Sequence, residues 1–187
     1  MHSLKPITAL GGSTPQTTTI GSVTIAEVDD IALASVATRK GGKTATDKLL
    51  KSTIGAVPAI GKTASKGEVS GFWVGPDQWM IAAPLASHET IADDLASRAN
   101  SKASITEQTG AWAIFDISGA AMADVCERLC AAPIRSMATG DVTRSTIHQI
   151  SCFLIPLPDG ETLRMIGPRA PAGSLHHAIL SAATSVS

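Results

Sequence analysis

The sequence contains no tyrosine, and aromatic residues make up only 3% of its 187 residues. Charged residues are also few, at 17%, below the roughly 25% that soluble domains usually carry. The 15 basic and 16 acidic residues are interspersed, whereas binding to nucleic acid or to an anionic membrane requires a clustered positive field. The low charge has two explanations: an alanine-rich globular protein, or a surface partly covered by partner proteins.

Long apolar runs and a cysteine framework are missing as well. No run approaches the roughly 18 apolar residues that span a bilayer, and the first ten residues contain too short an apolar core for a signal peptide. Three cysteines are an odd number, which argues against a disulfide framework. We therefore expect a cytoplasmic protein without a membrane segment.

The chain is long enough for one domain with a sizeable core. Residues 1–19 are rich in Ser, Thr, Gly and Pro and are expected to form a flexible arm. Residues 20–187 are expected to form a single globular α+β domain. Within it, residues 20–28 and 31–37 have the composition of two strands separated by a pair of aspartates.

Both halves of this domain show the order strand, helix, hairpin, helix. Helices are expected over 44–55, 88–100, 119–132 and 172–183, and residues 145–155 are expected to form one strand. The similar segments PDQWMI and PDGETLRMI end at Ile81 and Ile166, one in each half. This order predicts two quasi-repeated, ferredoxin-like βαββα modules, over about 20–104 and 105–187.

Two of the three tryptophans flank one short turn, in the segment FWVGPDQWMIAA. The turn residues Pro76 and Asp77 separate two β-type runs, so the segment predicts a hairpin that brings Trp73 and Trp79 together across its strands. A strand tryptophan is most often part of a core, but tryptophan is also enriched at interface hot spots. We expect the tip of the hairpin or one tryptophan edge to meet a partner subunit.

Catalytic motifs are not evident. Ser174 lies near His176 and His177, but on an expected helix without a nucleophile signature. The segment RKGGKTATDK resembles a phosphate-binding loop, yet that motif requires glycine where this chain has Ala37. A dinucleotide-binding GxGxxG pattern is also missing from the sequence.

Two groups of residues leave alternatives open. Cys126, Cys130, His148 and Cys152 could supply four zinc ligands, although free cysteines are more often buried in a core. Asp116 lies in an otherwise apolar strand, where a charge requires a partner. It is either paired with an arginine, Arg144 or Arg164, or it anchors a substrate.

Three segments resemble the gamma subunit of bacterial heterotetrameric sarcosine oxidase: WVGPDQWMI at 73–81, EQTGAWAIFDISGAAMADVCERLC at 107–130 and RSTIHQISCFLI at 144–155. The first resembles the family's W-x-G-P-[DE]-x-W-L segment, with Met80 in place of leucine. The resemblance covers roughly residues 20–183. It implies a fold similar to the folate-binding portion of the glycine cleavage T protein.

The resemblance also implies a function. The family's enzyme oxidatively demethylates sarcosine to glycine, reduces oxygen to hydrogen peroxide, and passes the one-carbon unit to tetrahydrofolate or releases it as formaldehyde. This chain would be a small structural subunit without catalytic residues or a cofactor of its own. Alpha, beta and delta subunits would be its partners and would hold FAD, FMN, NAD, tetrahydrofolate and zinc. The alternative is a free-standing folate-binding protein related to the T protein, with Asp116 as the candidate pterin anchor.

Overall fold

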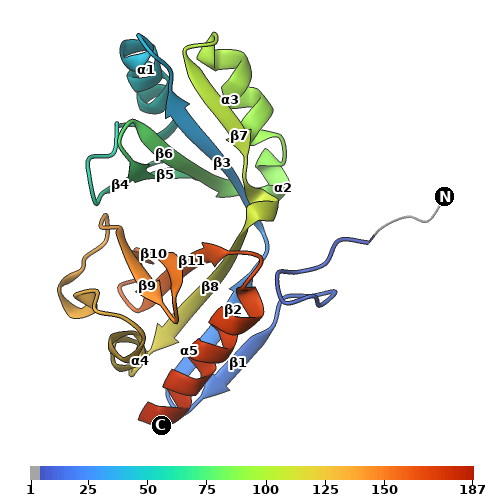
Figure 1. Ribbon diagram of the computed structural model, residues 1–187, viewed down its shortest axis with the longest axis vertical. Coiled ribbons are helices and arrows are strands. Elements are labelled where there is room, and N and C mark those ends of the chain that lie inside the picture. Colours follow the sequence, from blue (N-terminus) through green and yellow to red (C-terminus); the bar gives the residue numbers. More distant parts are fainter. Residues whose placement is uncertain (1–4) are drawn as a thin grey trace. The chain divides into compact units, whose positions relative to one another are not determined.

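The computed structural model describes residues 5–187 and divides the chain into two compact units (Figure 1). The first unit comprises the described residues up to 29 together with 111–139 and 143–187. The second unit comprises residues 30–110 and 140–142. Each unit is built on one antiparallel sheet with helices, which confirms the predicted α+β class.

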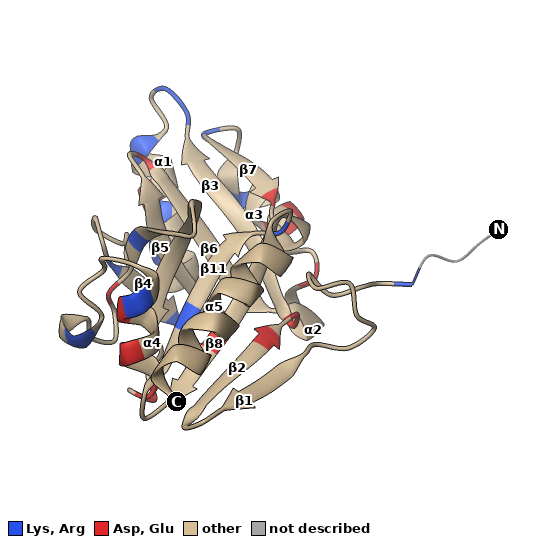
Figure 2. Cartoon of the chain, turned by 60° about the horizontal axis from the view of Figure 1, so that its bottom comes forward, with Lys and Arg blue, Asp and Glu red and all other residues tan. Residues whose placement is uncertain are grey.

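The first unit contains a six-stranded sheet in the order β1-β2-β8-β11-β10-β9. Its elements along the chain are β1 (Thr17–Ile20), β2 (Val23–Val28), β8 (Trp112–Gly119), α4 (Met122–Leu129), a 3-10 turn (Ile134–Ser136), β9 (Thr143–Ile147), β10 (Ile150–Pro156), β11 (Thr162–Pro168) and α5 (Ala172–Val186). Helices α4 and α5 pack on one face of this sheet, and α5 carries no Lys, Arg, Asp or Glu (Figure 2). Val125 of α4 and Leu175 and Ile179 of α5 share a core with Phe115 and Met165 of the strands.

The second unit contains a five-stranded sheet in the order β4-β5-β6-β3-β7. Its elements are β3 (Ile31–Thr38), α1 (Lys43–Ile54), β4 (Thr63–Lys66), β5 (Val69–Gly75), β6 (Gln78–Pro84), α2 (Leu85–His88), α3 (Ile91–Ala99) and β7 (Ala103–Glu107), followed by a 3-10 turn (Thr109–Ala111). Leu50 and Ile54 of α1 and Leu95 of α3 pack with Val36 and Ile81 of the strands. Both long helices therefore contribute to the same core.

The order strand, helix, hairpin, helix holds in both halves of the chain, as predicted. It is β3, α1, β5–β6 and α3 in the first half, and β8, α4, β10–β11 and α5 in the second. The helix ends follow local signals. Gly55 ends α1 in a left-handed conformation (φ 82°), with its N–H donating to the carbonyl of Lys51, and Pro171 precedes α5.

The division of the chain differs from the expected boundaries. The strands over 20–28 and 31–37 are present, but β2 pairs with β8 and so belongs to the sheet formed by the second half. The break at Asp29 and Asp30 is therefore the point where the chain passes from one unit to the other. Local composition identifies a strand, whereas its partner is decided by long-range pairing.

Residues 5–19 differ from the expected flexible arm. Thr17 to Thr19 belong to β1, which pairs with β2. The carboxylate of Glu27, 5% exposed, accepts backbone N–H bonds from Leu10 (2.8 Å) and Gln16 (3.1 Å). The guanidinium of Arg169 donates to the carbonyl of Thr8 at 2.7 Å. The segment is thus bound to the first unit by polar contacts that its Ser/Thr-rich composition does not reveal; residues 1–4 of the expected arm lie outside the described residues.

Two further elements differ from expectation. The single strand expected over 145–155 is two strands, β9 and β10, joined at His148 and Gln149. Both turn residues have positive φ (47° and 66°), the conformation of a type I′ hairpin turn, which usually carries Asn-Gly. The helix expected over 88–100 begins at Ile91, and the residues before it include the short helix α2, Leu85–His88.

None of the helices within residues 5–187 combines the length and the apolar character that crossing a membrane requires.

Candidate functional site

The β5–β6 hairpin has the predicted cross-strand pair of tryptophans. Trp73 pairs directly with Trp79, and Pro76 and Asp77 form the exposed turn. Asp77 adopts a left-handed conformation (φ 54°), and its carbonyl accepts the N–H of Thr38 at 2.9 Å. The turn is therefore tied to the neighbouring strand β3 while its side chains face solvent.

The two tryptophans have different environments. Trp79 is 4% exposed, and its indole Nε1 donates to the carbonyl of Pro58 at 3.0 Å, which satisfies its only donor. Trp73 is partly buried against the same core. Trp79 is therefore a core residue. Of the four residues expected at an interface, only Pro76, Asp77 and part of Trp73 are accessible to solvent. That these residues meet a partner stays a prediction.

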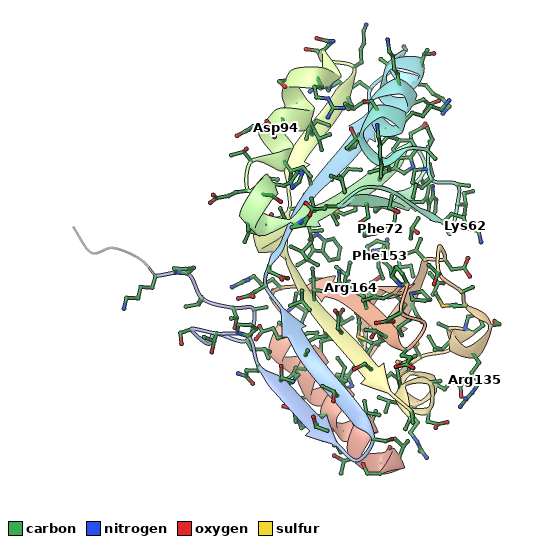
Figure 3. The ribbon with its side chains drawn as sticks, turned by 180° about the vertical axis from the view of Figure 1, so that it is seen from behind. Lys62, Phe72, Asp94, Arg135, Phe153 and Arg164 are labelled. Carbon is green, nitrogen blue, oxygen red and sulfur yellow. The ribbon has the colours of Figure 1, made fainter. Side chains whose placement is uncertain are left out.

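Asp116 forms the arginine pair that the sequence left as one of two alternatives. Its carboxylate accepts two hydrogen bonds from Arg164, from Nε at 2.8 Å and from the terminal nitrogen at 2.7 Å. The two residues are cross-strand neighbours on β8 and β11, and their side chains are 19% and 22% exposed. Arg164 is labelled in Figure 3. Arg144 instead donates to Ser151 Oγ and lies over the ring of Phe153. Asp116 is thus already neutralised within its own sheet.

The four residues considered for zinc do not come together as a metal site. Cys126 and Cys152 are buried in the core of the first unit, and burial raises the pKa of each thiol to about 12. His148 is exposed in the β9–β10 turn, not on the strand that holds Cys152. Within residues 5–187, no group of three or more His, Cys, Asp or Glu side chains is placed to hold a metal ion. Cys126 and Cys152 are core residues, and Cys130 is partly buried against the same core.

The serine and histidines at the start of α5 do not form a nucleophile pair. His176 stacks on Phe115 of β8, with 5.5 Å between ring centroids and 15° between planes. Burial lowers the pKa of His176, and the neighbouring His177 adds to this, while the buried Glu27 acts in the opposite direction. Ser174 and His177 are both exposed. His176 therefore serves to pack α5 against the sheet.

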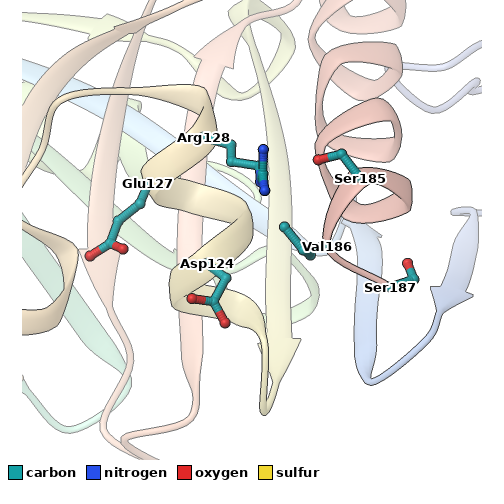
Figure 4. Close-up of a pocket in the computed structure, with 6 residues that line it drawn as sticks. All are labelled: Asp124, Glu127, Arg128, Ser185, Val186 and Ser187. Carbon is teal, nitrogen blue, oxygen red and sulfur yellow. The ribbon is translucent and has the colours of Figure 1, made fainter.

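A shallow groove lies between α4 and α5 in the first unit (Figure 4). One part of it, about 580 Å³, is lined by Asp124, Glu127 and Arg128 of α4 and by the last residues of α5. A second part, about 480 Å³, shares Arg128 and Ser185 with the first and extends to His148 and His177. Nothing in the sequence indicates this groove, because neither helix carries a motif and their packing is a tertiary feature.

The comparisons with known proteins establish the fold. No protein-family model and no curated protein sequence matches this chain. A chain of the heterotetrameric sarcosine oxidase from Corynebacterium sp. U-96, in complex with pyrrole 2-carboxylate, superimposes with a TM-score of 0.76 at 18% identity. The match covers 87% of this chain and 84% of that chain.

The aminomethyltransferase T of the glycine cleavage system from Bartonella henselae superimposes with a TM-score of 0.63 at 15% identity. That match covers 82% of this chain but only 44% of the transferase, so this chain spans less than half of it. This chain shares its fold with both proteins, which agrees with the two ferredoxin-like modules predicted from the sequence. At these identities the similarity establishes the fold and does not assign an activity.

Proposed function

We propose that this chain is a small, non-catalytic structural subunit of a heterotetrameric sarcosine oxidase. The observation that carries the proposal is the reciprocal match with the oxidase chain, 87% of one and 84% of the other. A subunit with one structural task is expected to correspond to its counterpart from end to end. The transferase, in contrast, contains more than half of its length outside the match.

The described side chains support a structural role in a second way. Asp116 is held by Arg164, Cys126 and Cys152 are protonated core thiols, and His176 packs on a phenylalanine. A nucleophile needs an adjacent base, and an acid–base catalyst needs a group close to its reacting proton. The residues that the sequence suggested for catalysis, substrate binding or zinc are therefore engaged in core packing and ion pairing.

In the proposed assembly this chain binds alpha, beta and delta subunits, and the other subunits hold FAD, FMN, NAD, tetrahydrofolate and zinc. The assembled enzyme oxidises the N-methyl group of sarcosine, releases glycine and reduces oxygen to hydrogen peroxide. The one-carbon unit leaves as formaldehyde or on tetrahydrofolate. This chain contributes surface, and we assign part of that surface to the hairpin tip formed by Trp73, Pro76 and Asp77.

Co-expression tests the assembly. The tagged chain is produced with and without the three other chains from the same genome, and native mass and the visible spectrum of the captured material are recorded. We expect a colourless protein alone and a yellow complex of four unequal chains on co-expression. A colourless monomer that does not bind these chains but binds tetrahydrofolate would establish the alternative, a free-standing folate-binding protein. In that case Asp116→Asn would be expected to abolish folate binding.

The hairpin tip is tested within the complex by Asp77→Lys, which reverses a charge on an exposed turn residue. Glu68→Lys is the matched control, because Glu68 is an exposed acidic residue at the opposite end of β5, in the β4–β5 turn. We expect Asp77→Lys to reduce recovery of the complex while Glu68→Lys leaves it unchanged. Equal recovery with both variants would remove the tip from the interface and leave the subunit proposal intact.

A further inference from the structure

Arg128 projects from α4 toward α5, into the groove between the two helices (Figure 4). It is exposed, and among residues 5–187 its guanidinium forms no ion pair. The carboxylates nearest to it along α4 are Asp124 and Glu127, and both are bound by Arg135 from the following 3-10 turn. The positive charge of Arg128 is therefore not neutralised by its own helix.

The adjoining part of the groove gathers further groups that bind anions. His148 reaches it from the β9–β10 turn and His177 from α5, and the Ser181 hydroxyl lines the same wall. None of these three side chains has a hydrogen-bond partner within the described part of the chain. Arg128, the two imidazoles and the hydroxyl thus face one hollow from three different elements, and that part of the groove has no carboxylate in its lining.

The volume of this part, about 480 Å³, is within the range of small-molecule sites, and its floor includes the apolar side chains of Leu129 and Ala178. A guanidinium offers two parallel N–H donors to an oxyanion, and protonated imidazoles add single donors. Separate donors on three sides suit a tetrahedral anion better than a planar one. We propose that the α4–α5 groove is a binding site for a small molecule carrying a phosphate or sulfate group, held by Arg128, His148 and His177.

The groups that face the two imidazoles are Arg128 of α4 and, along α5, His176 beside His177. Asp124 and Glu127 lie at the other part of the groove and are paired with Arg135.

Sulfate is the probe of choice because it does not titrate between pH 6 and 8, whereas phosphate does. The ¹⁵N-labelled full chain is titrated with sodium sulfate at constant ionic strength, and amide shifts give the dissociation constant. We expect saturable shifts at Arg128, His148, His177 and Ser181 in the millimolar range.

Substitutions distinguish specific binding of sulfate in the groove from nonspecific electrostatic attraction to the protein. Arg128→Gln is expected to weaken sulfate binding at least about fivefold, as loss of a charge-assisted contact does. His148→Gln combined with His177→Gln should also weaken sulfate binding, because it removes both imidazole rings from the groove. Lys48→Gln, which removes an exposed positive charge from α1 of the other unit, is the matched control and should change affinity less than about twofold.

All four positions are exposed, so these variants are expected to fold, and thermal unfolding verifies it. Non-saturable shifts, equal weakening by Arg128→Gln and Lys48→Gln, or acetate binding as tightly as sulfate would overturn the assignment. The site lies within this chain alone, and these outcomes are independent of whether the chain assembles with other subunits.

Discussion

The Asp116–Arg164 pair allows a prediction whose size follows from its burial. Removing one partner of a fully buried pair costs about 3–5 kcal/mol, while exposed pairs contribute about 0.2–1 kcal/mol. The two side chains are 19% and 22% exposed and share two short hydrogen bonds. We therefore expect Asp116→Asn to lower the free energy of unfolding by about 2 kcal/mol, between these limits.

The chain contains a matched control for this variant. Asp124 pairs with Arg135 through the same chemistry, but these side chains are 53% and 58% exposed. Asp124→Asn is expected to cost much less than Asp116→Asn, because solvent screens the pair and Glu127 still binds Arg135. Urea denaturation monitored by circular dichroism gives both values on the same scale.

A double-mutant cycle isolates the pair itself. Arg164→Met keeps the apolar stem and removes the charge, so the double variant with Asp116→Asn should be less destabilised than the sum of the single variants, by about 1–2 kcal/mol. The reasoning is refuted if Asp116→Asn costs no more than Asp124→Asn, or if the two substitutions at the pair are additive. Either result would mean that Asp116 is not held by Arg164 in solution.

Three further predictions concern buried groups. Burial raises the pKa of the Cys126 and Cys152 thiols to about 12, so in the folded protein at pH 8 only about one thiol in ten thousand is ionised. Both cysteines should therefore react with a disulfide reagent at pH 8 only after unfolding. Trp79→Phe should cost about 2–3 kcal/mol in urea denaturation, because it removes the bond to the Pro58 carbonyl and leaves a void. The pKa of His176 is lowered in the folded state, so the unfolded chain binds more protons at this residue. The free energy of unfolding should therefore fall as the pH drops below about 6.5. His176→Gln should lack this part of the pH dependence.

Each of these has a contrary outcome that is equally measurable. Rapid labelling of all three thiols in the native protein would contradict the burial of Cys126 and Cys152. A loss below about 0.5 kcal/mol for Trp79→Phe would place the indole outside the core. A pH profile of stability that is identical in the wild type and in His176→Gln would show that His176 has the same pKa in both states.

Much of the candidate site was accessible from sequence where the signals are local. The Pro76-Asp77 turn between two β-type runs predicted the hairpin and the pairing of Trp73 with Trp79. A lone aspartate in an apolar strand left an arginine pair as one of two alternatives, with Arg164 among the two candidate partners. In both cases the physical reason is short-range: turn chemistry and the cost of burying an unpaired charge act on neighbouring residues.

Other features required the tertiary structure. Strand β2 could not be assigned to its sheet from composition, because pairing with β8 joins residues about ninety positions apart and any strand of similar pattern would have satisfied the local preference. The His148-Gln149 turn was hidden inside a continuous β-type run, since its residues lack the usual turn signature.

The sequence by itself determined the α+β class, the order of elements in each half and the hairpin. These depend on hydrophobic periodicity and turn residues, which act over a few positions. Tertiary structure decided which strands share a sheet, that Glu27 and Arg169 bind the N-terminal segment, and that Arg128, His148 and His177 face one groove. Those relations join residues that are distant along the chain, and only packing of the helices and strands brings them together.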